Sequence, residues 1–345
     1  MAGRKRKEVT AREITGLKYF DRLAPLLERL HDVGCQRDKA GNRELHFDQY
    51  CLLVLLFLFN PIVTSLRGLQ QASQLAKVQK RLGCPRAALG SLSESVAVFE
   101  PERLREIVLE LGAELKPLAR DARLKDVPAL TAVDGTLLAA LPRLMEASYL
   151  KQTTGSGLVK WRLHTHFEVD RGVPTRIDIT PDGGGEHDER AVLERTIQAD
   201  RTYVMDRGYA KFALFNAIVA AGSSYVCRLR DNSDYRLLES RPLSDADRAL
   251  NVIRDELVEI GLHGKVEARP DHPVRLVVVQ INPHTSRGKY RGGSTGPASD
   301  GLLRIGTNLL DVPAEIIALI YVYRWTIEIY QPECPSSARL YRRAA

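Results

Sequence analysis

Paired cysteines, long apolar runs and repeated segments are all missing from this sequence of 345 residues. Its five cysteines are dispersed and form no Cys-x-x-Cys pair of the kind that a zinc ribbon needs. An odd, scattered set fits a reducing compartment better than secretion, and no apolar segment follows the basic first residues, so we expect no signal peptide. The most apolar run, residues 50–63, is too short for a membrane span and predicts a buried helix. These absences favour a cytoplasmic protein without a membrane role.

What is present is an ordinary globular composition. Hydrophobic residues make up 44% and charged residues 27% of the chain, which excludes wholesale disorder, a collagen repeat and a disulfide scaffold. At roughly 150 residues per domain, the length predicts about two folding units. The 50 Lys and Arg against 43 Asp and Glu give a net charge of +7, which permits a polyanionic partner without requiring one.

Residues 1–125 predict a helical N-terminal domain. Apolar residues recur at helical spacing between 104 and 118, and residues 19–31, 46–59 and 65–82 also favour helices. The last of these segments places basic and amide side chains between its apolar positions. We interpret this pattern as a solvated helix face, with contact to a DNA backbone as the alternative.

From residue 126 the sequence alternates strands with helices, which predicts an α/β layer. A buried strand at 129–133 is expected to stop at a turn formed by residues 134–136, and alternation over 161–169 predicts a half-exposed strand. The alternation of strands and helices becomes less regular between residues 230 and 300, which predicts an insertion there. Further strands are expected at 176–180, 202–205, 225–229, 274–281 and 302–310, with helices at 187–199, 210–221 and 313–330.

Three acidic residues are candidates for catalysis. Asp134 and Asp206 each follow a predicted strand, and Glu328 lies on the last predicted helix. Carboxylates placed in this way can converge on divalent cations such as Mg²⁺, which prefer oxygen ligands. Two such ions can activate a water or a 3′-hydroxyl and stabilise the leaving oxygen of a phosphodiester. By spacing alone, a role as a cap or turn residue is the favoured explanation of an aspartate after a strand.

The last predicted helix adds two residues to this set. Tyr321, Arg324 and Glu328 are separated by three and four residues, so a continuous helix would place them on one face. An Arg one turn before a Glu can hold a substrate phosphate or orient the carboxylate. An ordinary ion pair on a surface helix is the alternative.

Together these motifs resemble bacterial DDE transposases of the insertion-sequence-four group. The resemblance rests on Val-Asp-Gly-Thr around Asp134, on Asp-Arg-Gly-Tyr beginning at Asp206, and on the Tyr-x-x-Arg-x-x-x-Glu series that ends at Glu328. The last spacing is the most specific. The helical opening is also similar, so the resemblance extends over about residues 20–330.

The resemblance implies a ribonuclease-H-like core over 126–330, with a β-rich insertion at about 230–300. It also implies that Asp134, Asp206 and Glu328 bind Mg²⁺, for which Mn²⁺ substitutes. Tyr321 and Arg324 would contact double-stranded DNA near the cleaved strand. The implied reaction is cleavage at transposon ends and joining of the freed 3′-hydroxyl to target DNA, carried out by a homo-oligomer on DNA.

The sequence departs from the family pattern after Glu328. The family signature continues with a lysine seven residues later, where this chain has Pro335, and Pro332 breaks the helix. Residues 331–345 lack apolar periodicity and resemble the tail that a frameshift or truncation leaves. We therefore expect impaired activity. A catalytically silent DNA-binding remnant and a metal-dependent nuclease of the same fold are the alternatives.

Other features are assigned simpler roles. His164 and His166 can bind a metal together, but a solvent-facing pair is the favoured interpretation. The glycines at 183–185 predict a flexible loop followed by a cap, with Asp188 as a possible supporting residue of the acidic site. Trp325 is expected to pack against the sheet, with base stacking as the alternative. The basic residues of 287–291 and 4–7 are candidates for DNA contacts.

Overall fold

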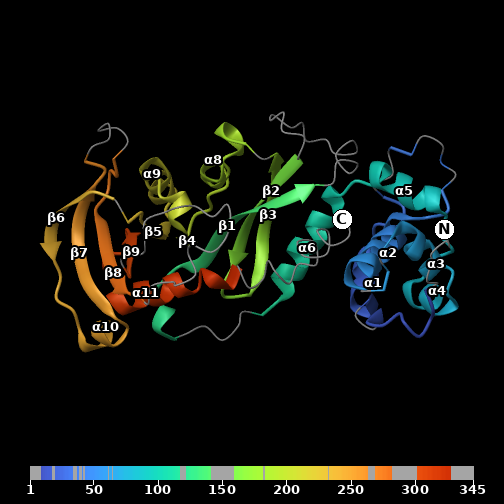
Figure 1. Cartoon of the computed structure of the whole chain (residues 1–345), viewed down its shortest axis with the longest axis horizontal. Coiled ribbons are helices and arrows are strands. Elements are labelled where there is room, and N and C mark those ends of the chain that lie inside the picture. The colour runs from blue at the N-terminus through green and yellow to red at the C-terminus, as the bar shows by residue number, and fades with distance from the viewer. Residues whose placement is uncertain are drawn as a thin grey trace, which may run out of the picture. The chain divides into compact units, whose positions relative to one another are not determined.

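The computed structural model of the chain describes thirteen segments, which divide between two compact units (Figure 1). The described residues of one unit lie within Met1–Glu114, and those of the other lie within Leu115–Ala140 and Leu150–Gln331. The described residues are 9–17, 20–33, 37–38, 41, 43–60, 62–63, 65–116, 122–140, 159–181, 183–231, 233–262, 269–281 and 301–327.

The N-terminal unit is helical within its described residues, as the sequence predicts. The apolar run expected to be a buried helix forms most of α2, whose Leu53 and Leu56 lie in a core with Leu69 and Val78. The expected helix over 65–82 is divided in two, because the first helix ends before Gln74 and the next begins after Leu75. The helices are α1 (Phe20–Glu28), α2 (Phe47–Phe59), α3 (Leu66–Ser73), α4 (Ala76–Leu82), α5 (Leu89–Val98) and α6 (Glu102–Glu114).

The second unit is a mixed α/β structure built on a nine-stranded sheet with the order β3-β2-β1-β4-β5-β9-β8-β7-β6. Strands β1, β2 and β3 are antiparallel, β4 and β5 run parallel to β1, and β9 pairs antiparallel with β5. The bounds are β1 (Ala129–Ala140), β2 (Val159–Glu168), β3 (Val173–Pro181), β4 (Arg201–Met205), β5 (Ser224–Arg228), β6 (Tyr235–Ser240), β7 (Val252–Ile260), β8 (Val274–Gln280) and β9 (Leu302–Thr307).

Alternate residues of the central strands pack into two different cores. Leu130 and Ala132 of β1 and Val204 of β4 lie in one core with α11 (Ala314–Val322). Val133 of β1 and Tyr203 and Met205 of β4 lie in the other core. That core also contains residues of α9 (Phe212–Ala220) and α8 (Glu189–Glu194) (Figure 1). This separation follows from the two-residue period of a strand and identifies the face on which each side chain lies.

The region expected to be an insertion extends the same sheet. Its described residues form β6, β7, β8 and α10 (Asp245–Ala249). Arg275 of β8 donates two hydrogen bonds to Asp255 of β7 and further bonds to the backbone carbonyls of Leu309 and Leu310, before α11. The insertion is thereby bonded to the segment that leads into α11.

Two expected boundaries are wrong. β1 does not stop at residues 134–136 but continues to Ala140, because its pairing with β2 extends from Thr131 to Ala140. The expected helix over 313–330 is interrupted after Val322 by a turn at Tyr323 and Arg324. No helix in the described segments is long and apolar enough to span a membrane.

Candidate active site

Asp134 lies in β1, and Asp206 directly follows the neighbouring parallel strand β4. In the pairing of β1 with β4, Thr131 is opposite Tyr203 and Ala132 is opposite Val204. Continuing this register by two residues places Asp134 opposite Asp206. By the alternation of β1, Asp134 lies on the sheet face of Ala132, which is the face that packs against α11.

Each carboxylate is held by one local hydrogen bond. The Thr136 hydroxyl donates to Oδ2 of Asp134 at 3.2 Å, and the Gly208 backbone N–H donates to Oδ1 of Asp206 at 2.7 Å. Asp206 is thus a cap of the 3₁₀ turn Arg207–Tyr209, so the simpler explanation of a strand-end aspartate is partly correct. The other oxygen of each carboxylate makes no hydrogen bond with the described part of the chain.

The donor set of these two residues fits a divalent cation. Within the described segments, no Lys, Arg or His nitrogen lies within 4.0 Å of either carboxylate. Two adjacent carboxylates without a positive partner repel one another, and an oxygen-binding cation relieves that repulsion. Glu328 lies outside the described residues.

Tyr209 is a neighbour that the sequence analysis did not single out, although it ends the Asp-Arg-Gly-Tyr motif. Its side chain is buried. Burial, followed by the charges of Asp134 and Asp206, raises its pKa well above the ordinary value for a phenol. Tyr209 therefore keeps its proton and places a neutral hydroxyl within electrostatic reach of both acids.

Tyr321 and Arg324 lie at the end of α11, near Asp206. Burial raises the pKa of Tyr321 to about 12. The positive charge of Arg324 lowers this pKa, and the negative charge of Asp206 raises it. The Arg324 backbone N–H donates to the Tyr321 carbonyl at 3.1 Å, so this end of the helix has a tighter, 3₁₀-type turn. Tyr321 is 5% and Arg324 7% exposed, so both are packed inside the unit.

The expectation that Trp325 packs against the sheet is wrong. Its side chain is 48% exposed, and the Arg324 guanidinium carbon lies 4.4 Å from the centre of a Trp325 ring. The turn at Tyr323 and Arg324 interrupts the helix, so a residue expected on its packed face lies at the surface instead. An exposed aromatic beside an arginine is the arrangement needed for stacking on a base.

The interpretation of His164 and His166 as solvent-facing is also wrong. Both side chains are buried, with Nε2 of His164 2.9 Å from the Thr180 hydroxyl and Nε2 of His166 3.2 Å from the Thr196 hydroxyl. Burial lowers the pKa of each imidazole to about 4. These histidines are neutral and serve to pack the structure near neutral pH.

Asp188 caps α8, as expected, by accepting a hydrogen bond from the Arg190 backbone N–H at 2.9 Å. The Arg190 side chain also donates two hydrogen bonds to Asp188, and these bonds lower the pKa of its carboxyl to about 2. Its charge adds to those acting on Tyr209. Asp188 is therefore a charged neighbour of the acidic pair that is already bound to an arginine.

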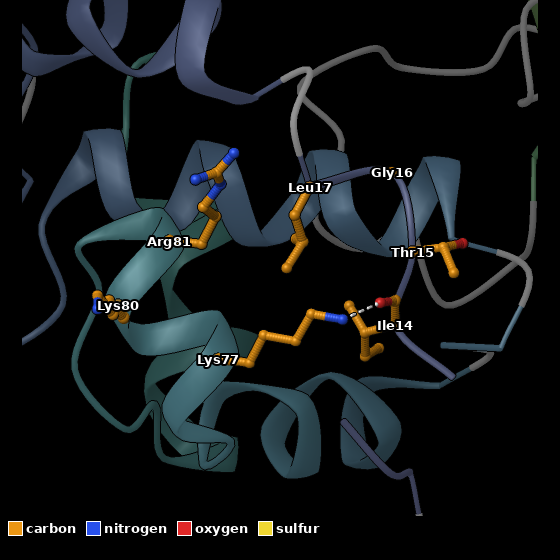
Figure 2. A pocket seen from close by; sticks show the side chains of 7 residues that line it. All are labelled: Ile14, Thr15, Gly16, Leu17, Lys77, Lys80 and Arg81. Carbon is orange, nitrogen blue, oxygen red and sulfur yellow. Dashed lines mark hydrogen bonds between the residues drawn. The ribbon is translucent and has the colours of Figure 1, made fainter. Parts of the chain in front are cut away.

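The N-terminal unit contains a cavity of about 510 Å³ beside the basic segment of α4 (Figure 2). Lys77 donates to the backbone carbonyls of Ala11 and Ile14, and Arg81 pairs with Asp21 at 2.6 Å. Two of the three cations that line the cavity therefore bind the chain itself. The basic segments 287–291 and 4–7 and the tail 331–345 lie outside the described residues.

Comparisons with known proteins identify relatives of this chain. A family model described as "Transposase DDE domain" matches residues 126–336, which is more than half of the chain. A curated protein of Sinorhizobium fredii (strain NBRC 101917 / NGR234), named "Putative transposase y4zB", is 25% identical over 169 residues. That match covers 49% of this chain but only 42% of the relative. A solved piggyBac transposase synaptic complex with hairpin DNA has 10% identity and a TM-score of 0.41, with 96% of this chain and 71% of that chain covered.

Proposed function

The chain belongs to the transposase DDE domain family, and from this membership we propose that it cleaves DNA at transposon ends and joins the freed 3′-hydroxyl to target DNA. The observation that carries the proposal is the pair of Asp134 and Asp206 on adjacent parallel strands without a positive partner among the described residues. Such a pair has the chemistry of a divalent-cation site.

We further propose that the chain is a member of the insertion-sequence-four group with a ribonuclease-H-like core at 126–330. Support comes from the order β3-β2-β1-β4-β5, with three antiparallel strands beside two parallel ones, and from the strand-rich extension that follows. Residues 1–125 form the accessory, DNA-binding domain in this proposal. Glu328 is the third acid, and it follows directly on Ile327, which lies in the same core as Ala132 and Val204.

In the proposed mechanism, Asp134, Asp206 and Glu328 would hold Mg²⁺ or Mn²⁺, and the bound ion would supply polarisation of the phosphodiester and activation of the attacking oxygen. Thr136 and the Gly208 N–H fix the orientation of the two aspartates. Tyr209 remains protonated and adds no further negative charge to the site.

We propose that Tyr321 and Arg324 contact the DNA near the cleaved strand. Their burial requires that the end of α11 rearrange when DNA binds. The partners are double-stranded DNA and further copies of the chain, acting at the nucleoid in the cytoplasm. Pro332 and Pro335 stand where the family helix continues, so the proposal includes reduced activity from the altered tail.

The test is a cleavage and joining assay on DNA carrying the flanks of the element, with Mg²⁺ or Mn²⁺. Asp134→Asn and Asp206→Asn keep the side-chain shape and remove the charge. The matched control is Asp200→Asn, an exposed position at the other end of β4 whose left-handed backbone tolerates asparagine.

We expect metal-dependent cleavage that both site variants lose and the control retains. Cleavage that survives in Asp134→Asn and Asp206→Asn would contradict the assignment of the site. DNA binding without cleavage by any form would favour the silent remnant, and cleavage without joining would favour a nuclease.

A further inference from the structure

Strand β3 forms one edge of the nine-stranded sheet. Among the described residues only β2 pairs with it, so the other side of β3 has no strand partner there. Pro174 and Pro181 lie near the two ends of this strand. Proline cannot donate a hydrogen bond to a neighbouring strand and is confined to such edges. The outward-directed N–H and C=O groups between the two prolines are therefore a template for one further strand.

One face of β3 carries exposed apolar side chains. In the register of the sheet, Asp134 is opposite Thr165, and Thr165 is opposite Ile177. Ile177 and Ile179 therefore lie on the sheet face of Asp134. Their side chains are 39% and 53% exposed. An edge strand with exposed apolar side chains pairs readily with another chain, so this side of β3 is suited to association.

The other face of β3 carries two opposite charges. The Arg176 side chain donates two hydrogen bonds to the Asp178 carboxylate, two residues further along the strand. Both side chains stay partly exposed, at 31% and 23%. They can therefore exchange this local pair for partners on a neighbouring strand.

The order of these side chains is self-complementary. When two β3 strands pair antiparallel about a two-fold axis at Ile177, Arg176 of each copy lies opposite Asp178 of the other. Ile177 then lies opposite its own copy, and Thr175 lies opposite Ile179. Directly opposed residues have Cβ atoms about 4.5–5.5 Å apart, which is within reach of an ion pair. Axes centred on Arg176 or Asp178 would instead place like charges opposite one another, so the charges select the axis at Ile177.

We propose that β3 is a homodimerisation surface, at which two copies of the chain join their sheets edge to edge. The inference names the surface by which copies of the chain associate, and it rests on the proposed function only for that association. A second copy is the occupant because the charge order of β3 fits β3 itself. An interface of this kind uses the same surface on both copies and closes on itself, so it produces a dimer rather than a fibre.

The dimer would place Asp134 and its copy on the same face of one continuous sheet, because directly paired residues share a face. Asp134 lies in the same row of the sheet as Ile177, two strands away. Five strand spacings of about 4.8 Å then separate the two copies of Asp134, which is roughly 24 Å along the sheet. Two acidic sites that face the same side can act on two DNA ends in one assembly.

The test is self-association of the full chain without DNA or added metal, so its result does not depend on cleavage. Sedimentation velocity is measured from the low micromolar range to a few hundred micromolar, because one pair of strands buries less area than a standard interface. We expect a monomer–dimer equilibrium. Ile177→Lys places two like charges at the two-fold axis and should raise the Kd of the dimer at least about tenfold.

A charge-exchange experiment tests the register. Arg176→Asp leaves two acidic side chains on each β3, and Asp178→Arg leaves two basic ones, so either variant alone should raise the Kd at least about tenfold. In an equimolar mixture of the two variants, each opposed pair again joins an acid to a base, and we expect heterodimers with nearly the affinity of the parent. Both variants lose the local pair within β3, so that loss cannot produce the recovery.

The matched control is Leu238→Lys, because Leu238 is 60% exposed in β6, the strand at the opposite edge of the sheet. It should leave the Kd unchanged. A parent that stays monomeric at the highest concentration overturns the proposal. A dimer that Ile177→Lys leaves intact, or that Leu238→Lys weakens equally, overturns it too.

If Ile177→Lys fails to fold, the mixture of charge variants decides, and a mixture without recovery overturns the register and with it the surface. The result is also distinguishable from a failure of the proposed function. A chain that dimerises through β3 but never cleaves DNA would contradict the proposed function and leave this inference standing.

Discussion

The Asp247 side chain accepts a hydrogen bond from the backbone N–H of Glu315, in the first turn of α11, at 2.8 Å. Asp247 lies in α10 of the insertion, 68 residues earlier in the chain. The same carboxylate accepts from the Ser244 backbone and hydroxyl, both at 2.8 Å. One buried acid of the insertion thus caps α11, whose last turn contains Tyr321 and which is followed by the turn that contains Arg324.

Removing this cap should destabilise the α/β unit. Asp247→Ala leaves the N–H groups of Glu315 and Ser244 without their acceptor, and we expect a loss of about 1–2 kcal/mol in the free energy of unfolding. Urea unfolding of the full chain measures it. Asp245→Ala, a fully exposed position on the same helix, should change stability by less than about 0.5 kcal/mol. A loss of stability in Asp247→Ala that is as small as the loss in Asp245→Ala would show that the cap contributes nothing.

The buried pair of Arg275 and Asp255 should behave as a unit. Arg275→Met leaves an unpaired buried carboxylate, and we expect a cost of about 3–5 kcal/mol. Arg275→Met/Asp255→Leu removes both charges and should recover much of that loss. A double-mutant cycle by urea unfolding measures the coupling. Additive single effects would refute it.

Gly135 is needed because β1 passes close to α8. A Cβ at this position would lie 2.6 Å from Cδ of Glu189, whose carboxylate is paired with Arg162 and cannot easily move. Gly135→Ala should cost about 1–3 kcal/mol and, by shifting Asp134, lower the cleavage rate at least about tenfold. Gly90→Ala, which meets open space in α5, should not destabilise the chain. A wild-type cleavage rate in Gly135→Ala would contradict the argument.

The α/β unit should lose stability in acid because of its buried histidines. Since the folded pKa of His164 and His166 is about 4 and the unfolded value is about 6.5, the unfolded state binds more protons between these values. The contribution of these histidines to the free energy of unfolding should therefore be complete above pH 6.5. It should fall towards pH 4, by up to about 3 kcal/mol per histidine.

The matched variant for this pH dependence is His166→Gln. The Thr196 hydroxyl donates to the Val192 carbonyl at 2.8 Å, so Nε2 of His166 must donate to Thr196. A glutamine amide can replace that donor but does not titrate. The variant should show a shallower loss between pH 6.5 and 4, and an unchanged profile would show that His166 does not titrate there.

Trp325 should contribute to DNA binding without contributing much to folding. Because its side chain is half exposed, Trp325→Ala should change stability little, whereas loss of one stacked base costs about 1–3 kcal/mol of binding. Fluorescence anisotropy with labelled single-stranded and duplex ends measures the change. Val322→Ala, at a similarly exposed position, is the control. Equal affinity of Trp325→Ala and the parent would exclude stacking.

Periodicity and strand-end residues were enough to predict the mixed α/β class and most strands of the second unit. The proximity of Asp134 and Asp206 could also be predicted from the sequence, because parallel strands bring equivalent positions together. The position at which β1 ends could not be predicted from the sequence. Gly135 has the local signature of a turn, and only the close approach of Glu189 from α8 explains a glycine inside a strand.

The errors at His164, His166 and Trp325 have a similar origin. Alternation identifies the two faces of β2 but does not show that both are covered, so it wrongly predicts that the histidines face solvent. At the end of α11, apolar periodicity continues through Tyr323, and nothing local predicts the turn that exposes Trp325. In each case packing between elements distant in the sequence decides the outcome.

The antiparallel pairing of β5 with β9 has a consequence for the newly synthesised chain. Val226 of β5 lies opposite Thr307, and their positions in the sequence differ by 81. A ribosome releases the N-terminal part first, so β5 has an uncovered edge until synthesis has passed Thr307. Such an edge can pair with another nascent chain. Between the synthesis of these two strands, the nascent chain therefore carries an aggregation hazard that the folded protein lacks.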